Sequence, residues 1–401
     1  MIRIHEEMKQ LGNVRSVIRD TFEYGNRRAA EIGRENVFDF SLGNPSIPAP
    51  AAVGDAIRDL LDTTDSVALH GYTSAPGAMN VRKAIAADLN RRFSAGVQAE
   101  DLYMTCGAAA SLTVSIHALA CPGDEFVVIA PFFPEYRVFV ESAGAKLVVV
   151  PADTDRFQID FDAFEACLTE HTKAVIVNTP NNPTGVIFSP ETLARLAKTL
   201  RRASEKFGSP IFLISDEPYR ELVYDDNAVV PYLPLLYDYT LVCYSFSKSL
   251  SLPGERIGYI AVPGKIPEKN DLFAAVAGAG RALGFVCAPS LFQQVIARCL
   301  GVPTDLSAYR ENRDLLYSAL TEYGFDCVHP DGAFYLFVKS PEPDAAAFAE
   351  KARKYELLLV PSDSFGCPGY VRIAYCVSHE MIRRSLPAFR LLAKEYGLDI
   401  R

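Results

Sequence analysis

The chain has 401 residues, 49% of them hydrophobic and 22% charged, and a formal net charge of −9. This length exceeds what one simple core needs and predicts two domains, while an acidic balance without a basic stripe argues against a nucleic-acid partner. No apolar run is long enough to span a bilayer. The nine cysteines form no Cys-x-x-Cys pair and the six histidines are dispersed, so we expect reduced thiols, a cytoplasmic location and no metal.

The N-terminal segment is polar. Residues 1–12 are charged and lack the apolar stretch of a secretory signal, so we expect none. Residues 13–36 are mildly amphipathic and predict a helix. Four arginines are expected on its solvent face: Arg15, Arg19, Arg27 and Arg28.

Two loops and two helices are expected next. The cluster at 43–46 predicts a turn, which could be an entry hinge or a loop that lines a site; spacing alone favours the hinge. A loop at 71–77 leads into a helix whose buried face recurs every four residues, at Val81, Ile85 and Leu89. Another helix starts near Gly107, where small residues allow backbone N–H groups to approach an anion.

The central part of the chain alternates strand and helix patterns. Short runs rich in β-branched residues predict strands, with amphipathic stretches such as 190–207 between several of them. Such alternation indicates an α/β fold with three layers, in which helices cover both faces of a mainly parallel sheet. The predicted strands are 125–130, 146–150, 173–178, 211–215 and 240–243.

Polar and aromatic clusters follow four of these strands directly. They are Pro131 to Tyr136, Asn178 to Gly185, Asp216 to Tyr219, and the segment around Lys248. Functional loops of parallel sheets lie beyond the carboxyl ends of the strands, so we expect these clusters at one edge.

Beyond Gly264 the pattern changes to α+β, which predicts a second, smaller domain. We treat 274–284 as a glycine-alanine segment that precedes two helices. Helices are predicted at 289–300, 305–323, 344–355 and 379–395, and strands at 333–338, 357–360 and 370–375.

The clustered residues suit an aldehyde cofactor that carries a phosphate. A lysine beyond a strand end, among hydroxyls and close to an arginine, can form an imine while its neighbours hold the phosphate. Such a cofactor needs a carboxylate that keeps its pyridine ring nitrogen protonated and hydrogen-bond donors to its phenolic oxygen, which set the pKa of the imine. An aromatic side chain covers the ring, and an arginine can bind a substrate carboxylate through two parallel hydrogen bonds. Residues of every type are present: Lys248, Ser245, Arg256, Gly107, Asp216, Tyr219, Asn182, Phe133 (or Phe132) and Arg372.

Eight short motifs occur along the chain, and although each alone is a weak match, all eight in this order are specific for one family. They are Gly43-Asn44-Pro45, Gly71-Tyr72, Thr105-x-Gly107-Ala108, Asn181-Asn182-Pro183-Thr184-Gly185, Asp216-Glu217-x-Tyr219, Ser245-x-Ser247-Lys248, Arg256-Ile257-Gly258 and Arg372-Ile373-Ala374. Over almost its whole length the chain thereby resembles the fold-type I, class I/II pyridoxal-phosphate-dependent aminotransferases, those similar to aspartate aminotransferase.

The resemblance implies a transaminase of amino-acid metabolism that moves an amino group between an L-amino acid and a 2-oxo acid by a ping-pong mechanism. It makes Lys248 the imine lysine and proton carrier, with Asp216 and Tyr219 as further catalytic residues. Cofactor contacts would come from Gly107, Ala108, Phe133, Asn182, Ser245, Arg256 and Tyr72, and substrate contacts from Gly43, Asn182 and Arg372.

The resemblance also implies a homodimer with shared sites, in which Tyr72 reaches the phosphate of the other chain. The expected domains are an N-terminal segment, 1–45, that packs with the small domain, a large cofactor-binding domain, 46–288, and a small C-terminal domain, 289–401.

The chain departs from the family pattern at one position. Some members that prefer aspartate carry a lysine where this chain has Ala109, which weakens the case for a dicarboxylate substrate bound in that way. Arg281 lies roughly where other members place an arginine that binds a distal carboxylate in the site of the neighbouring chain. The amino donor, the oxo acid and the pathway stay open.

Two alternatives remain at this point. A pyridoxal-phosphate C–S β-lyase, similar to cystathionine β-lyase, uses the same scaffold and residue types. A cofactor-binding transcription regulator is disfavoured, because the motifs begin at Gly43 and leave no room for a helix-turn-helix domain.

Overall fold

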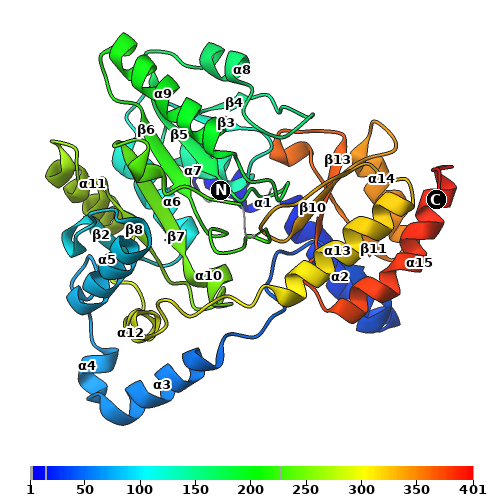
Figure 1. The fold of residues 1–401 in the computed structure, drawn as a ribbon, viewed down its shortest axis with the longest axis horizontal. Helices are drawn as coiled ribbons and strands as arrows, with labels where there is room; N and C mark the ends of the chain where they lie inside the picture. The colour runs from blue at the N-terminus through cyan, green and yellow to red at the C-terminus, as the bar shows by residue number, and fades with distance from the viewer. Residues whose placement is uncertain (1–2, 14–15, 226–227, 401) are drawn as a thin grey trace.

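The structure is a computed structural model and describes residues 3–13, 16–225 and 228–400, so the prediction for Arg15 lies outside the described residues. Two main sheets lie side by side, each with its own helices (Figure 1). The larger has seven strands in the order β2-β8-β7-β6-β5-β3-β4. Their bounds are β2 Leu102–Thr105, β3 Glu125–Ile129, β4 Lys146–Val150, β5 Thr172–Asn178, β6 Phe212–Asp216, β7 Thr240–Ser245 and β8 Gly258–Ala261.

Helices cover both faces of the large sheet, as the alternation predicted. Strands β4, β3, β5, β6 and β7 run parallel, and β8 is antiparallel to β7 and β2. Successive side chains point to opposite faces. Ile214 therefore packs with α6 (Ala108–Leu119), α7 (Glu135–Ser142) and α11 (Lys269–Ala282), whereas Leu213 packs with α8 (Phe161–Ala166) and α9 (Pro190–Phe207).

Three further helices share one apolar cluster beside the β7–β8–β2 end of the sheet. They are α3 (Ala51–Thr63), α5 (Met79–Phe93) and α12 (Ser290–Arg298), which share this cluster with Val242 and Tyr244. Helix α5 packs on β2, and α12 packs on both α5 and α3. On these contacts α12 groups with the large sheet, although the predicted domain boundary at 288/289 placed it with the small domain. Helices α3 and α4 (Ser66–His70) extend away from both sheets (Figure 1).

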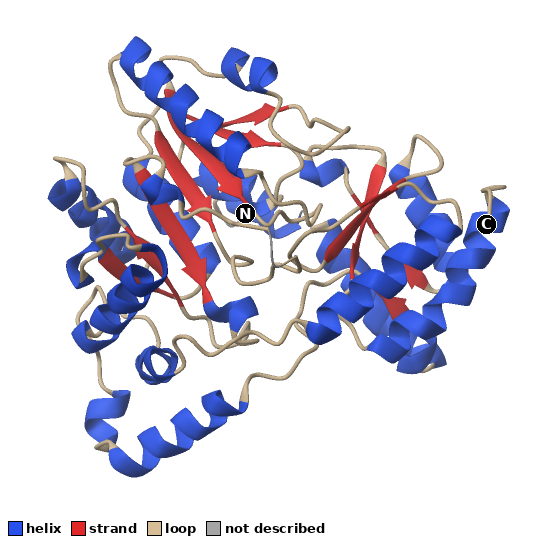
Figure 2. Cartoon of the chain, viewed as in Figure 1, coloured by secondary structure: helices blue, strands red, loops and turns tan. Residues whose placement is uncertain are grey.

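The smaller sheet has four strands in the order β12-β13-β10-β9, all antiparallel. Their bounds are β9 Cys327–Val328, β10 Tyr335–Lys339, β12 Val360–Pro361 and β13 Tyr370–Ala374. Helices α13 (Ser307–Glu322), α14 (Ala345–Ala352) and α15 (His379–Glu395) lie around it (Figure 2). No described helix is long and apolar enough to cross a membrane.

The N-terminal segment packs against this smaller sheet. Strand β1 (Phe38–Asp39) pairs in parallel with β11 (Leu357–Leu358). Helix α2 (Val17–Ile32) crosses the pair closely, because a Cβ at Gly25 would lie 2.7 Å from Leu358 Cδ1.

Several elements differ from the sequence-based expectations. Residues 6–13 form a helix, α1 (Glu6–Asn13), and β2 lies where no strand was predicted. The glycine-alanine segment is itself helical, in α11. Its small residues allow close packing on β2, since a Cβ at Gly280 would lie 2.2 Å from the Tyr103 hydroxyl.

Candidate active site

A cavity of about 260 Å³ opens where β5, β6 and β7 end, and the small sheet forms one of its walls. Ten of the predicted residues line it: Gly43, Ala108, Phe133, Asn182, Asp216, Tyr219, Ser245, Lys248, Arg256 and Arg372. Gly107 adjoins it as the N-cap of α6. Phe133 lines the cavity, whereas Phe132 is buried and does not line it.

Lys248 stands on a single helical turn, α10 (Phe246–Ser249), directly after β7. Its Nζ donates to the backbone oxygen of Gly43 at 2.7 Å and lies 5.3 Å from the centroid of the Phe334 ring. Burial lowers the pKa of Lys248 to about 8, with smaller contributions in the same direction from Arg256 and Arg372 and an opposing effect of Cys376. The amine is therefore partly neutral near physiological pH, which a nucleophile or proton acceptor needs.

Asp216 ends β6 and is only 5% exposed. Tyr136 Oη donates to its Oδ2 at 2.5 Å, whereas its Oδ1 is buried without a partner among the described residues. Burial raises the pKa of Asp216 to about 7, and the hydrogen bond from Tyr136 opposes that shift. A positive group at Oδ1 would favour the ionised carboxylate.

Glycine and arginine form an anion cradle at the start of α6. Gly107 has a φ of +84°, a backbone conformation that favours glycine, and a Cβ there would lie 3.2 Å from the Arg256 guanidinium. Ser245 and Ser247 line the same cavity, with their hydroxyl oxygens 2.7 Å apart. Free N–H groups at a helix N-terminus, hydroxyls and a guanidinium together suit a phosphate.

Arg372 projects from β13 and is 2% exposed. Its Nη1 donates to Asn182 Oδ1 at 3.1 Å and its Nη2 to the backbone oxygen of Ser41 at 2.5 Å. Its Nε is buried and has no partner within the described chain. A buried guanidinium with a free donor suits a carboxylate ligand.

The two unpartnered atoms and the cradle fit the cofactor expected from the sequence. Buried polar groups are normally hydrogen-bonded, so Asp216 Oδ1 and Arg372 Nε indicate a missing cation and a missing anion. Pyridoxal phosphate has a pyridinium nitrogen and a phosphate, and its amino-acid partner has a carboxylate. The residues present therefore fit the group.

Sequence reasoning missed several residues of the site. Tyr136, Asn178 and Tyr335 all contact predicted residues: Asn178 Nδ2 donates to the backbone oxygen of Asp216 at 2.9 Å, and the Tyr335 and Tyr219 hydroxyls are 2.8 Å apart. Tyr136 and Asn178 both belong to the clusters predicted at the strand ends, so their positions there could have suggested them. Ile18 of α2 also lines the cavity.

Two predicted residues lie outside the cavity of this chain. Tyr72 is 100% exposed, and Arg281 is exposed at the last turn of α11. Neither lines the cavity. Their predicted roles therefore require a second chain.

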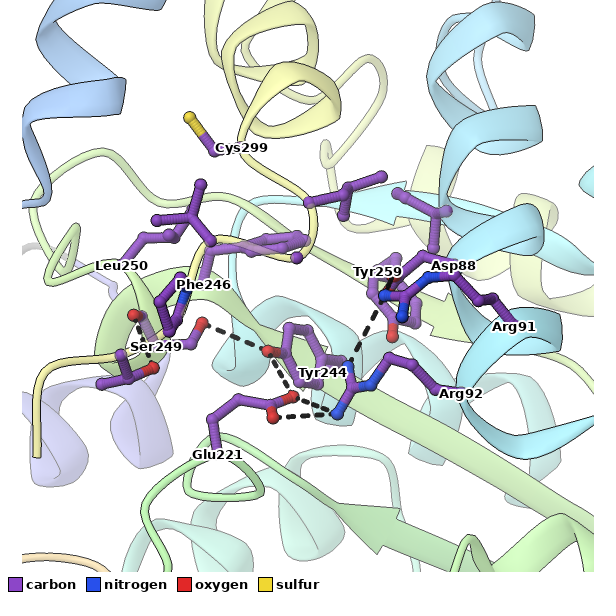
Figure 3. Close-up of a pocket in the computed structure, with 16 residues that line it drawn as sticks. Asp88, Arg91, Arg92, Glu221, Tyr244, Phe246, Ser249, Leu250, Tyr259 and Cys299 are labelled. Carbon is purple, nitrogen blue, oxygen red and sulfur yellow. Dashed lines mark hydrogen bonds and ion pairs between the residues drawn. The ribbon is translucent and has the colours of Figure 1, made fainter.

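A second cavity, of about 280 Å³, lies behind α10 (Figure 3). Arg92 Nη2 lies 2.8 Å from both carboxylate oxygens of Glu221, and the Tyr244 hydroxyl lies 3.2 Å from Glu221 Oε1 and 3.1 Å from Ser249 Oγ. None of the residues predicted for cofactor or substrate lines it. The contact between Tyr244 and Ser249 joins this cavity to α10, the turn that carries Lys248.

Comparison with known proteins gives concordant matches along nearly the whole chain. Residues 35–389 match the family described as aminotransferase class I and II. The chain is 31% identical over 373 residues to the aspartate/prephenate aminotransferase of Thermus thermophilus, covering 91% of this chain and 93% of that one. It is also 31% identical over 328 residues to the putative aminotransferase YugH of Bacillus subtilis, covering 79% and 82%.

Solved structures agree with these sequence matches. An aminotransferase from Eubacterium rectale superimposes with a TM-score of 0.96 at 57% identity, covering 99% of this chain and all of that one. Aspartate aminotransferase from Thermus thermophilus with maleate superimposes with a TM-score of 0.85 at 27% identity, covering 98% and 100%.

Proposed function

The chain belongs to the class I and II aminotransferases, and from the geometry of its cavity we propose which residues perform the reaction. The enzyme is a fold-type I, pyridoxal-phosphate-dependent transaminase. The related proteins are named as aminotransferases, so the C–S β-lyase alternative is not favoured. The assignment of individual residues, the assembly and the substrate are the proposed part.

Bound pyridoxal phosphate supplies an electron sink for the bond that is broken at the substrate's Cα. We assign its phosphate to the backbone amides of Gly107 and Ala108 and to the side chains of Ser245 and Arg256. Phe133 covers the ring. These residues all line or adjoin one cavity, which supports the assignment.

Asp216, Tyr219 and Asn182 hold the polar atoms of the ring. Asp216 Oδ1 accepts from the protonated ring nitrogen, because it is the free oxygen of a carboxylate fixed by Tyr136. Tyr219 donates its hydroxyl proton to the phenolic oxygen. Asn182 Oδ1 already accepts from Arg372, so its Nδ2 is the atom that remains to donate there.

Lys248 holds the cofactor and moves the proton at the substrate's Cα. Its lowered pKa of about 8 leaves part of the amine neutral, so Lys248 can accept a proton near physiological pH. Because the backbone oxygen of Gly43 accepts from Nζ, it fixes the direction of the amine. Gly43 also borders the space for the substrate.

Arg372 binds the α-carboxylate of the amino acid and of the 2-oxo acid. Its unpartnered Nε and its fixed guanidinium plane support this role. Both substrates carry that carboxylate, so one arginine serves both halves of a ping-pong reaction. The preference for the distal group of the substrate stays open, because Ala109 replaces a lysine that binds a distal carboxylate in some members, whereas Arg281 could bind one.

The proposed assembly is a homodimer with shared sites. Tyr72 is fully exposed, and near it α3 and α4 expose Leu61 (54%) and Val67 (81%), which supports an interface there. Tyr72 then reaches the cofactor phosphate of the partner chain. The nine cysteines are free, which supports the proposed cytoplasmic location.

The proposed domains are the large sheet with its helices and the small sheet with the N-terminal segment. The pairing of β1 with β11 supports placing residues 1–45 with the small domain. The contacts of α12 favour a boundary after Leu300 instead of after Ala288.

One observation carries the residue assignment: Lys248 shares a cavity with two buried polar atoms that have no partner in the part of the chain that the structure describes, Asp216 Oδ1 and Arg372 Nε. A panel of amino donors tests the function, one half-reaction at a time, through the cofactor's absorbance. Incubation with cystathionine, followed by detection of pyruvate, tests for C–S β-lyase activity. A donor that exchanges its amino group with 2-oxoglutarate is expected, and pyruvate release without amino transfer would contradict the proposal.

A further inference from the structure

Tyr335 connects two functional residues of the cavity that come from different parts of the chain. Its hydroxyl lies 2.8 Å from the hydroxyl of Tyr219, and its ring centroid lies 4.6 Å from Cζ of Arg372. It is buried and lines the cavity. Tyr219 is proposed to bind the cofactor's phenolic oxygen and Arg372 the substrate carboxylate.

The contact with Arg372 follows from strand register. Tyr335 of β10 pairs with Ala374 of β13, and Phe337 pairs with Arg372. Residues two apart in a strand share a face, so Tyr335 and Arg372 are diagonal neighbours on one side of the sheet. A guanidinium over an aromatic face is attracted to the ring, which fixes its plane.

The contact with Tyr219 has a defined direction once the cofactor is bound. A phenol has one proton to donate. If Tyr219 gives its proton to the cofactor's phenolic oxygen, its own oxygen can only accept from Tyr335. Burial keeps the pKa of both hydroxyls above the usual value, so both protons are in place at neutral pH.

The position of the Tyr335 hydroxyl is closely constrained. A Cβ at Gly43 would lie 2.1 Å from the hydroxyl oxygen, so glycine leaves the room that this hydroxyl occupies. The rings of Tyr219 and Tyr335 meet edge to face, with centroids 5.7 Å apart. The hydroxyl therefore has little freedom to turn away from Tyr219.

We propose that Tyr335 is a positioning residue with two separable parts: its hydroxyl donates to Tyr219 and strengthens the bond from Tyr219 to the cofactor, while its ring holds Arg372 for the substrate carboxylate. The inference rests on the proposed roles of Tyr219 and Arg372. Hydrogen bonds in a chain reinforce one another in a buried site. Loss of the hydroxyl should therefore change the cofactor's own titration, and loss of the ring should change substrate binding.

The test compares the pH titration of the bound cofactor's absorbance, without substrate, in Tyr219→Phe, Tyr335→Phe and the double variant. Weaker donation to the phenolic oxygen makes that oxygen hold the neighbouring proton more tightly, so the chromophore's pKa rises. We expect a rise of about 0.5 to 1 pH unit for Tyr335→Phe. In the Tyr219→Phe background the same change should add nothing, because the bond it strengthens is gone.

Substrate affinity separates the ring from the hydroxyl. Tyr335→Phe keeps the ring and should leave KM for the best donor within about twofold, whereas Tyr335→Leu should raise it about three- to tenfold. Tyr370→Phe is the matched control, since Tyr370 lies in the same sheet, stacks on Phe337 and does not line the cavity. It should leave the titration and KM unchanged.

Three results would overturn the inference. One is a cofactor absorbance pKa in Tyr335→Phe that equals the wild-type value, while the pKa in Tyr219→Phe is raised. Another is a further shift from Tyr335→Phe in the Tyr219→Phe background. An unshifted Tyr219→Phe would remove the proposed role of Tyr219, and the inference with it, which marks a failure of the proposed function itself.

Discussion

The hydroxyl of Tyr136 donates to Oδ2 of Asp216 at 2.5 Å, and Oδ1 of the same carboxylate has no partner among the described residues. One oxygen is thus fixed by the protein, and the other is left for a ligand. The hydrogen bond also favours the ionised form of a carboxyl group whose burial raises its pKa to about 7. Asp216 can therefore meet a cationic ring nitrogen at neutral pH.

Tyr136→Phe should shift cofactor binding to higher pH. Removal of the donor disfavours the charged carboxylate, so the pKa of Asp216 in the cofactor-free protein should rise above about 7, by up to about one unit. Binding that needs the carboxylate is then lost at a higher pH than in the wild type. Cofactor titrations between pH 6 and 8.5 measure this shift. Tyr239→Phe is the control. The same pH dependence of cofactor binding in Tyr136→Phe and in the wild type would contradict the proposal that Tyr136 stabilises the ionised carboxylate of Asp216.

Asp216→Asn should retain some cofactor but slow the loss of the Cα proton by about 10²–10³-fold. The amide keeps the size of the carboxylate but cannot hold the ring nitrogen protonated. Rapid-mixing measurements of a single half-reaction report this rate directly. Asp238→Asn, at an exposed position, is the control. A near-normal half-reaction in Asp216→Asn would remove Asp216 from its proposed role.

Arg372→Leu should raise KM for the amino donor by about 10²-fold or more, because a buried, charge-assisted pair of hydrogen bonds to the carboxylate is lost. The cofactor's absorbance should persist, since Arg372 is not assigned to the cofactor. The exposed Arg383→Leu serves as control. An unchanged KM would mean that another residue binds the carboxylate.

Tyr72→Phe should weaken cofactor retention by about tenfold to a hundredfold, because a charge-assisted hydrogen bond to the partner's phosphate is lost. The fold should be unaffected, since Tyr72 is fully exposed in the single chain. Equilibrium dialysis measures the affinity, and thermal unfolding measures the stability. A loss of stability with normal cofactor affinity would indicate a tyrosine packed for structural reasons.

Mixed dimers decide which chain Tyr72 serves. In a heterodimer of Tyr72→Phe and Lys248→Ala chains, the site with the intact Lys248 takes its Tyr72 from the Lys248→Ala chain if the tyrosine crosses the interface. Its cofactor affinity should then equal that of the wild type. An affinity equal to that of the Tyr72→Phe homodimer would show that the tyrosine acts within its own chain.

The sequence predicted the parts of the molecule that depend on local patterns. Strand β4 and helices α9 and α15 have the predicted bounds, because a β-branched run and a serine N-cap, followed by proline in α9, are local signals. Asp216 and Lys248 line the same cavity because the parallel strands β6 and β7 end at the same edge of the sheet. The alternation of strands and helices in the sequence predicted this parallel arrangement.

The supporting residues could not be predicted in the same way. Tyr136 meets Asp216 across 80 residues of chain, and Tyr335 meets Tyr219 across 116. Tyr136 belongs to a predicted cluster, but nothing in the sequence signals its contact with Asp216 or that of Tyr335 with Tyr219, because these contacts arise only when the strands pair and the two sheets meet. The packing of α12 on α3 and α5 is likewise a contact between distant segments.

The central claim is that Lys248 is the residue that holds the cofactor. Reduction of the loaded enzyme with borohydride, followed by peptide mapping by mass spectrometry, tests it most directly, with Lys198→Ala on the exposed face of α9 as the control. The account predicts that the cofactor's mass is found on the peptide containing Lys248, and that Lys248→Ala takes up no label and loses nearly all turnover. A label on any other lysine, with turnover preserved in Lys248→Ala, would contradict it.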